Sequence, residues 1–227
     1  MKRKILEQVL VARAARQAVA VITAVENGEQ RLVTAAEAAQ DVLSAALLDG
    51  FRFDRSALVD HEGKQYFVTI HNPPLRLLII GAVLIAQHVI GLARSVGYDV
   101  SVVDPRGAFA TALRFPDVEL HAEWPDEIMP KLGLDERTAI IALTHVSDID
   151  DKALSLALKS PAFYIGALGS RKTQAARMGR LTKLGFSENE LARIRGPIGL
   201  AIGAVGGPEI AISILAEMTK ALRLGFA

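Results

Sequence analysis

The stretch from Leu75 to Asp104 constrains the fold of this chain most, because it combines two apolar strands with one amphipathic helix. Residues 77–80 form a dense apolar run that is typical of a strand buried on both faces, and Gly81 follows it. An apolar stripe then recurs at helical spacing, at Ile85, Val89, Leu92 and Val96. Residues 99–103 read as a second strand that ends in Asp104, 23 residues after Gly81. This order predicts the first half of a Rossmann unit, in which such an acid binds a ribose.

The turn after the first strand departs from the dinucleotide-binding pattern. That pattern requires glycine at its second position, so that the backbone can approach a pyrophosphate, and Val83 stands there. Ala86 stands at the third position, where alanine is permitted. The turn therefore supports the fold more than it supports a bound nucleotide. Asp104 keeps two interpretations, a ribose ligand or an acid that begins the turn at Pro105.

Composition and charge exclude several classes of function. A net charge of +1 argues against a nucleic-acid-binding or membrane-surface protein, which would carry a strongly basic face. The chain has no cysteine, which rules out disulfides, zinc–thiolate sites and a cysteine nucleophile. Charged and polar residues interrupt the apolar positions of residues 1–17, so this segment is predicted to be an amphipathic helix and not a signal peptide. We therefore expect a soluble, cytoplasmic protein.

Two domains are expected, a small N-terminal α/β domain over residues 1–73 and a larger one over residues 74–227. The boundary is placed at Asn72-Pro73-Pro74, where a helix cannot continue. A helix over residues 35–48, stopped by Gly50, is predicted in the first domain. The strands predicted there cover residues 18–25, 30–34, 56–60 and 65–70.

Beyond Asp104 the chain continues to alternate between strands and helices. Further strands are predicted at residues 118–121, 138–143 and 162–165, and helices at residues 125–131, 149–159, 171–184, 188–194 and about 207–222. This alternation predicts an α/β fold with a doubly wound, parallel, Rossmann-like sheet.

Ligands of such sheets bind in the crevice beyond the carboxyl ends of the strands. The segment from Gly166 to Arg171 is the most suggestive there, because Gly166 and Gly169 free the backbone and Ser170 can cap the next helix. The N-terminus of that helix would present N–H groups to an anion. Residues 171–195 carry seven basic residues against two acidic ones. The alternative is that Ser170 is only a cap and the charges are only a solvated face.

Other polar residues near the crevice also have two interpretations. His145 follows a buried strand and is either a structural histidine, or a proton carrier or ligand. Asp148, Asp150 and Asp151 resemble an acidic or metal-binding group, but acids at a helix start more often interact with the helix dipole.

Five segments of the chain together resemble the XdhC/CoxI family across roughly residues 75–222. They are VVDPRGAFATALRFP (102–116), TAIIALTHVSDIDDKAL (138–154), YIGALGSRKT (164–173), RIRGPIGLAIGA (193–204) and PEIAISILAEM (208–218). The resemblance implies an accessory protein for molybdenum hydroxylases such as xanthine dehydrogenase. Such proteins are thought to hold the molybdenum–pterin cofactor, present it for sulfuration by a cysteine desulfurase, and pass it to the apoenzyme.

The resemblance thus indicates a cofactor chaperone rather than a catalyst, with the molybdenum cofactor as bound cargo and a homodimer as the expected assembly. No catalytic or metal-ligating residue is assigned. The expected cofactor-binding residues are Gly81, Ala82, Asp104, Arg106, His145, Gly166, Gly169, Ser170 and Arg171. An NAD(P)-binding oxidoreductase is the alternative from another class; Asp104 favours it and Val83 opposes it.

The chain departs from the family pattern at three polar positions, which are occupied by Leu84, Val146 and Ala201. It also lacks the glycine-rich segment of longer members, so a short-form member is expected. A third hypothesis follows, a partner subunit that binds no cofactor itself. An exposed apolar face on the C-terminal helix would favour that hypothesis, although the stripe of Ile210, Ile214, Leu215, Met218 and Leu222 is also what a core-facing helix requires.

Overall fold

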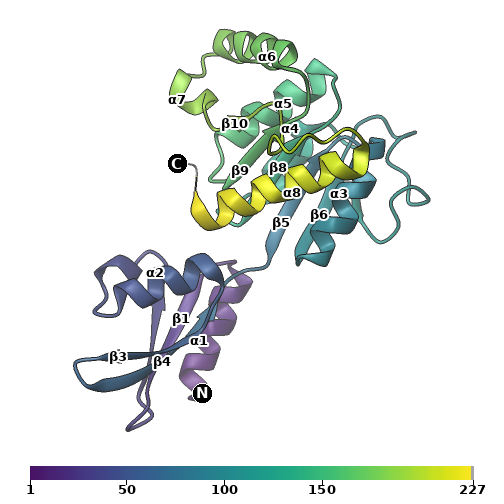
Figure 1. Cartoon of the computed structure of the whole chain (residues 1–227). Coiled ribbons are helices and arrows are strands. Elements are labelled where there is room, and N and C mark those ends of the chain that lie inside the picture. The colour runs from purple at the N-terminus through teal and green to yellow at the C-terminus, as the bar shows by residue number, and fades with distance from the viewer. Residues whose placement is uncertain (226–227) are drawn as a thin grey trace. The chain divides into compact units, whose positions relative to one another are not determined.

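A computed structural model describes residues 1–225 (Figure 1). The chain divides into two compact units, Met1–Pro73 and Pro74–Ala227. Among the described residues, no helix combines the length and the apolar character needed to cross a membrane.

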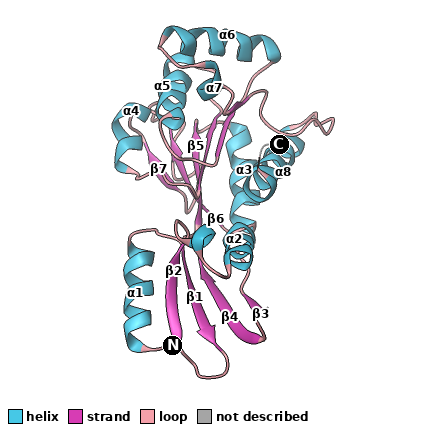
Figure 2. Cartoon of the chain, turned by 90° about the vertical axis from the view of Figure 1, so that its left-hand side faces the viewer, coloured by secondary structure: helices cyan, strands magenta, loops and turns pink. Residues whose placement is uncertain are grey.

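The N-terminal unit is a four-stranded antiparallel sheet with helices on both faces (Figure 2). Its elements in chain order are α1 (Arg3–Ala14), β1 (Val19–Ala24), β2 (Gln30–Thr34), the 3₁₀-helix η1 (Ala38–Gln40), α2 (Ser44–Phe53), β3 (Ala57–His61) and β4 (Lys64–His71), and the strand order is β2-β1-β4-β3. Successive residues of β1 point to opposite faces. Val19 and Val21 therefore pack with α1, and Ala20 and Ile22 pack with η1 and α2.

The predicted helix over residues 35–48 is wrong in both of its bounds. The segment first forms η1, and α2 then runs through Gly50 to Phe53. Gly50 does not stop the helix, because it is the residue that lets the helix approach β4. A Cβ atom there would lie 2.8 Å from Cδ1 of Ile70. The helix instead ends at Asp54, which adopts a left-handed conformation with φ 53°.

The C-terminal unit contains a six-stranded sheet in which all paired strands are parallel. Its strands are β5 (Leu75–Ile80), β6 (Tyr98–Val103), β7 (Glu119–His121), β8 (Thr138–Ala142), β9 (Tyr164–Ala167) and β10 (Ile194–Arg195), in the order β10-β9-β8-β5-β6-β7. The chain thus builds outward from β5 in one direction and from β8 in the other, which is the doubly wound Rossmann order. The predicted fold class is confirmed.

Helices cover both faces of this sheet (Figure 1). They are α3 (Leu84–Ser95), α4 (Pro125–Ile128), the 3₁₀-helix η2 (Met129–Lys131), α5 (Ser147–Leu158), α6 (Arg171–Lys183), α7 (Glu188–Leu191) and α8 (Gly207–Leu224). Leu77 and Ile79 of β5 pack with α3 and α8, whereas Leu78 and Ile80 pack with α4, α5 and α6. The strand is therefore buried on both faces, as its apolar run predicts.

The apolar stripe of α8 lies in the core, with Ile214 and Met218 fully buried and Leu222 packed against the same cluster. Two predicted elements near the end of the chain have different bounds in the structure. The strand predicted at residues 162–165 is present as β9, but it begins two residues later, at Tyr164, and ends at Ala167. The helix predicted over 188–194 ends at Leu191, because Ile194 and Arg195 pair with Ile165 and Gly166 as the sixth strand.

Candidate functional site

The chain order of the sheet reverses between β5 and β8, and the region beyond the carboxyl ends of these two strands is where the ligand crevice is expected. These two strands pair in parallel, Ile80 opposite Ala142, so their carboxyl ends meet at one edge. The segments that leave this edge are Gly81–Val83 after β5 and Leu143–Val146 after β8. Ligands of open α/β sheets bind at this topological position. The sheet therefore places the predicted residues Gly81 and His145 in adjacent loops.

Gly81 allows the two loops to approach each other closely. Its φ of 114° is a conformation that residues with a side chain rarely adopt, and a Cβ atom would lie 2.7 Å from Cγ2 of Thr144. Ala82 follows it and is fully buried, and Val83 is the N-cap residue of α3. Val83 is half-buried and packs against the core. A dinucleotide site has glycine at this position, so that a pyrophosphate can approach the backbone.

Asp104 lies at the end of β6 and is fully buried, and its carboxylate accepts four hydrogen bonds. Oδ2 accepts one from the N–H of Ala82 (2.8 Å) and one from Nη2 of Arg106 (2.7 Å). Oδ1 accepts two more from Arg106, from its backbone N–H (3.0 Å) and from Nε (2.9 Å). A carboxylate has about four acceptor sites, so none of them remains for a ribose.

Burial opposes the charged form of Asp104, but the hydrogen bonds from Arg106 and Ala82 outweigh it and hold the pKa of Asp104 below its ordinary value. The same contact raises the pKa of Arg106. The Arg106 guanidinium also lies 4.6 Å from the centre of the Phe109 ring. Asp104 thus fixes the Gly81–Val83 turn and the orientation of Arg106, and it is a structural residue of the crevice rather than a free ligand.

The turn after β8 is held from below by a second buried carboxylate, Asp150 of α5. Its Oδ1 accepts a hydrogen bond from Oγ1 of Thr144 (2.6 Å), and Oγ1 of Thr144 in turn accepts one from the N–H of Val146 (3.0 Å). Between them, His145 adopts a left-handed conformation with φ 61°, and it is exposed. Such a φ is uncommon for a residue with a side chain, so the hydrogen bonds of Thr144 stabilise an unusual turn.

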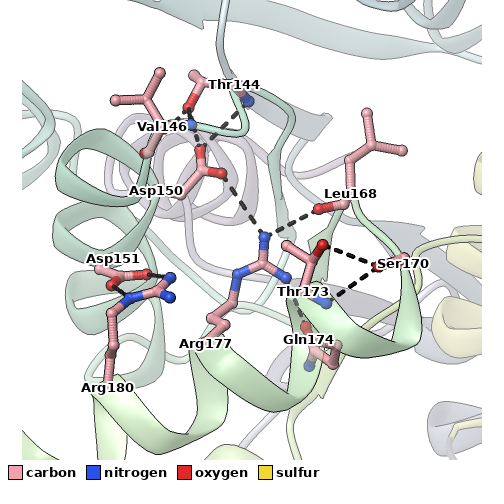
Figure 3. A network of polar contacts seen from close by, with 10 residues as sticks. All are labelled: Thr144, Val146, Asp150, Asp151, Leu168, Ser170, Thr173, Gln174, Arg177 and Arg180. Atoms are coloured by element: carbon pink, nitrogen blue, oxygen red, sulfur yellow. Dashed lines mark hydrogen bonds and ion pairs between the residues drawn. The ribbon is translucent and has the colours of Figure 1, made fainter.

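Arg177 of α6 connects this turn to the next loop of the crevice, as Figure 3 shows. Both Asp150 and Arg177 are 2% exposed, and Oδ2 of Asp150 lies 3.8 Å from Nη2 of Arg177. The same Nη2 donates to the carbonyl of Leu168 (2.9 Å), and Nη1 donates to Oε1 of Gln174 (2.6 Å). Desolvation raises the pKa of Asp150 and lowers the pKa of Arg177. The pair therefore links the loops after β8 and β9 at a cost in desolvation.

The predicted helix cap after β9 is confirmed. Oγ of Ser170 accepts a hydrogen bond from the N–H of Thr173 (3.1 Å), and Ser170 is the N-cap of α6. The N–H groups of Arg171 and Lys172 make no hydrogen bond within the part of the chain that the structure describes, and both side chains are exposed. Gly169, with φ 143°, begins this turn. The start of α6 thus offers an anion two N–H groups and two cationic side chains.

Some of the seven basic residues between positions 171 and 195 have structural partners and are not simply exposed to solvent. Arg177 is buried, and Arg180 forms an ion pair with Asp151. Arg193 donates three hydrogen bonds to the carbonyls of residues 158, 160 and 162. Structural roles therefore account for three of the seven cations. The cations at the α6 N-terminus, Arg171 and Lys172, are not among those three.

Gly166 and the loop after β10 form the far side of the crevice. A Cβ atom on Gly166 would lie 2.5 Å from Cδ1 of Ile198, so glycine at this position lets the loop after β10 pack closely on β9. The loop is held by Glu217 of α8, whose Oε2 accepts hydrogen bonds from the N–H of Gly199 (2.9 Å) and from the hydroxyl of Tyr164 (2.5 Å).

The sequence analysis considered Asp150 only as one of three acids at a helix start, and it did not identify Arg177 or Glu217 as parts of the site. For the first two a signal was present. Asp150 stands four residues before the buried Leu154, and Arg177 stands four residues before the buried Leu181. A charge at a core position of a helix stripe indicates a buried ion pair. Glu217 has no comparable signal, because its partners Tyr164 and Gly199 are distant in the sequence.

The three apolar replacements all lie at the surface of the crevice loops. Leu84 at the start of α3 is 68% exposed, and Val146 is 38% exposed. Ala201 is exposed in the loop between β10 and α8. Within residues 1–225, no group of three or more histidine, aspartate or glutamate side chains is placed to hold a metal ion. The arrangement can bind an anion and bury apolar ligand surface, and the described contacts assign no residue to acid–base chemistry.

The strand order and the loops that leave the carboxyl ends of β5 and β8 together define a Rossmann-type α/β protein. A family model described as the XdhC Rossmann domain matches residues 77–218. The chain therefore belongs to the XdhC family, and the resemblance inferred from the sequence is confirmed.

Relatives of known name agree with this assignment. The chain is 34% identical over 149 residues to the molybdenum cofactor insertion chaperone PaoD of Escherichia coli, covering 66% of this chain and 41% of that protein. It is 28% identical over 155 residues to a probable xanthine dehydrogenase subunit of Bacillus subtilis, covering 68% and 45%. The chain thus spans less than half the length of these two relatives.

A crystal structure described as a xanthine dehydrogenase from Bacillus halodurans has the same fold. Its TM-score is 0.69 at 23% identity, and the alignment covers 98% of this chain and 65% of that one.

Proposed function

We propose that this protein binds the molybdenum cofactor in the crevice between β5 and β8 and delivers it to a molybdenum hydroxylase of the xanthine dehydrogenase type. Membership of the XdhC family supports the proposal, as does the similarity to a chaperone named for cofactor insertion. Sulfuration of the bound cofactor by a cysteine desulfurase and action as a homodimer are further parts of it. With no cysteine in the chain, the sulfur would come from such a partner.

The observation that carries the proposal is the distribution of charge in the crevice. The carboxylate of Asp104 is fully hydrogen-bonded to Arg106 and Ala82. The acid that a dinucleotide site uses to bind its ribose is therefore not free. The cations and N–H groups at the start of α6 remain available for an anion. This balance favours a ligand with a terminal phosphate, such as the pterin of the molybdenum cofactor. The same observation, with Val83 in the turn, disfavours an NAD(P)-dependent oxidoreductase.

Equilibrium binding of molybdenum cofactor to the purified protein under anaerobic conditions, with NAD and NADP measured in parallel, tests the proposal. Arg171→Ala is expected to weaken cofactor binding roughly 10- to 100-fold, because a hydrogen bond to a charged group contributes roughly 1.5–3 kcal/mol. Lys183→Ala is the matched control, since it removes an exposed cation from the opposite end of the same helix. Binding should be unchanged there.

Each contrary result has a defined meaning. If both substitutions weakened cofactor binding equally, the phosphate would not bind at the N-terminus of α6. Tighter binding of NAD or NADP than of molybdenum cofactor would replace the proposal with the oxidoreductase. Binding of none of the three would favour a partner subunit, for which Leu84, Val146 and Ala201 are the first residues to restore to polar ones.

A further inference from the structure

A groove separate from the crevice runs along the outer face of α5. It encloses about 530 Å³ and is lined by Trp124, Asp126, Ser147, Asp148, Asp151, Lys152, Ser155, Leu156 and Leu184. These residues come from the start of α4, from three successive turns of α5 and from the end of α6, elements that Figure 1 places together. Along α5 the lining residues 147–156 extend over about 13 Å at 1.5 Å per residue. The groove is therefore long enough for two to three turns of a docked helix.

Apolar side chains on the floor of the groove are exposed to solvent. Leu184 is 64% exposed, Trp124 is 39% exposed, and Leu156 is half-buried. The ring of Trp124 is held in place by Lys152, whose Nζ lies 4.5 Å from the ring centre and 2.9 Å from Oδ2 of Asp126. An ordered aromatic side chain in an exposed apolar groove is typical of a protein-binding surface.

The side chains that line the groove carry a net negative charge. Three acids, Asp126, Asp148 and Asp151, line it together with one cation, Lys152. In the groove, Lys152 pairs with Asp126 and Arg180 pairs with Asp151. Asp148 is exposed and forms no ion pair or side-chain hydrogen bond within residues 1–225, so its carboxylate is available to a cation of a ligand. An acidic rim around an apolar floor is complementary to a segment with both basic and apolar residues.

We propose that this groove is a docking site for a basic, amphipathic helical segment of a partner protein. Apolar side chains of that segment pack on Trp124, Leu156 and Leu184, and an arginine or lysine pairs with Asp148. Spaced at i and i+4, such side chains match the repeat of the α5 turns that line the groove. Ser147 and Asp148 directly follow Val146, so a segment seated here also lies beside one loop of the crevice. The inference is independent of which ligand the crevice binds.

The test uses the full chain and a synthetic 14-residue amphipathic peptide that carries leucine on one face and arginine on the other. Trp124 is the only tryptophan, so its fluorescence reports on the groove alone. Saturable binding with a blue shift of Trp124 emission is expected at physiological salt. A peptide with glutamate in place of arginine should produce no shift.

Charge-reversal variants separate specific docking from general attraction. Asp148→Lys should weaken binding of the arginine peptide at least 10-fold, because it places a like charge against the peptide. Glu136→Lys makes the same change in charge at an exposed acid that does not line the groove, and it should weaken binding less than 2-fold. Both variants should retain the circular dichroism spectrum of the parent protein and a cooperative thermal transition, although Asp148→Lys places a cation in the first turn of α5 and should melt at a somewhat lower temperature.

Three results would overturn the proposal. Trp124 emission could stay constant while the peptide binds, which would place the peptide elsewhere. The two variants could weaken binding equally, which would reduce the effect to net charge. Arginine amide alone could reproduce the full shift with the same affinity as the peptide, which would make the groove a site for a small cation.

Discussion

Asp104 shows how one residue can occupy a ligand position without serving as a ligand. It stands at the end of the second Rossmann strand, where an acid commonly binds a ribose, yet four hydrogen bonds from Ala82 and Arg106 occupy its oxygens. Arg106 follows two residues later in the sequence, which makes this local pairing possible. A polar residue at a functional position therefore has to be judged by the groups that already hold it.

The lowered pKa of Asp104 predicts a specific dependence of stability on pH. Because the folded pKa lies below the unfolded value of about 3.9, Asp104 stabilises the fold above that pH, and the contribution is lost as the pH falls through the folded pKa. Asp104→Asn should reduce the free energy of unfolding by about 1–3 kcal/mol at pH 7. The difference from the parent protein should shrink as the pH falls below about 4.

Urea denaturation at a series of pH values measures this effect. Asp99→Asn is the control, because Asp99 is an exposed acid on the same strand β6 and does not contact Arg106. A difference between parent and Asp104→Asn that stays constant down to the lowest pH would contradict the prediction.

At the scale of secondary-structure elements, the buried pair of Asp150 and Arg177 joins α5 to α6. Each charge lies on the side of its helix that packs toward the sheet, and the two meet below the loops after β8 and β9 (Figure 3). A pair of apolar residues could pack the same helices at less cost in desolvation. The charged pair also binds Thr144 and the carbonyl of Leu168, so it positions the loops as well as the helices.

Loss of one partner of this pair should be severe. Arg177→Met leaves the carboxylate of Asp150 buried without its cation and should lower the free energy of unfolding by about 3–5 kcal/mol. Arg180→Met is the matched control, made on the same helix. Its ion pair with Asp151 is 41% exposed on the arginine side, so the loss should stay below about 1 kcal/mol.

Urea denaturation at pH 7 compares the two variants. Adding Asp150→Asn to Arg177→Met should recover part of the loss, because the buried charge is removed while an amide oxygen remains for Thr144. Equal destabilisation by Arg177→Met and Arg180→Met, or no recovery in the double variant, would argue against the buried pair.

At the scale of the whole molecule, the chain consists of two units with separate hydrophobic cores. Two apolar clusters lie among residues of the first 73 positions, and two lie among residues from position 75 onward. Because apolar burial provides most of the driving force for folding, a unit with its own core can fold by itself. The separation of the cores supports the proposed domain boundary at residues 73 and 74.

A fragment of residues 74–227 is accordingly expected to fold alone, with a cooperative thermal transition and an α/β circular dichroism spectrum. A fragment of residues 1–73 should also fold but melt at a lower temperature, because a small domain buries a smaller fraction of its surface. A 74–227 fragment that unfolds without cooperativity would contradict the domain assignment.

The sequence by itself determined the layered α/β fold, because the signals for it are local. The apolar run of residues 77–80, the stripe of α3 and the cap at Ser170 depend only on neighbours within a few positions. The same holds for the stripe of α8, whose period of 3.6 residues indicates which side is buried. The co-linear family segments were also sufficient to identify the XdhC family.

Tertiary structure alone decided which polar residues are free and which are already bonded. The strand at Ile194 forms because β9 offers an unpaired edge, and α2 continues through Gly50 because Ile70 packs against it. Asp104 is engaged by Ala82, 22 residues away, and Glu217 bonds Tyr164, 53 residues away. Such contacts depend on how distant segments pack. Local patterns of polarity, propensity and spacing contain no information about them.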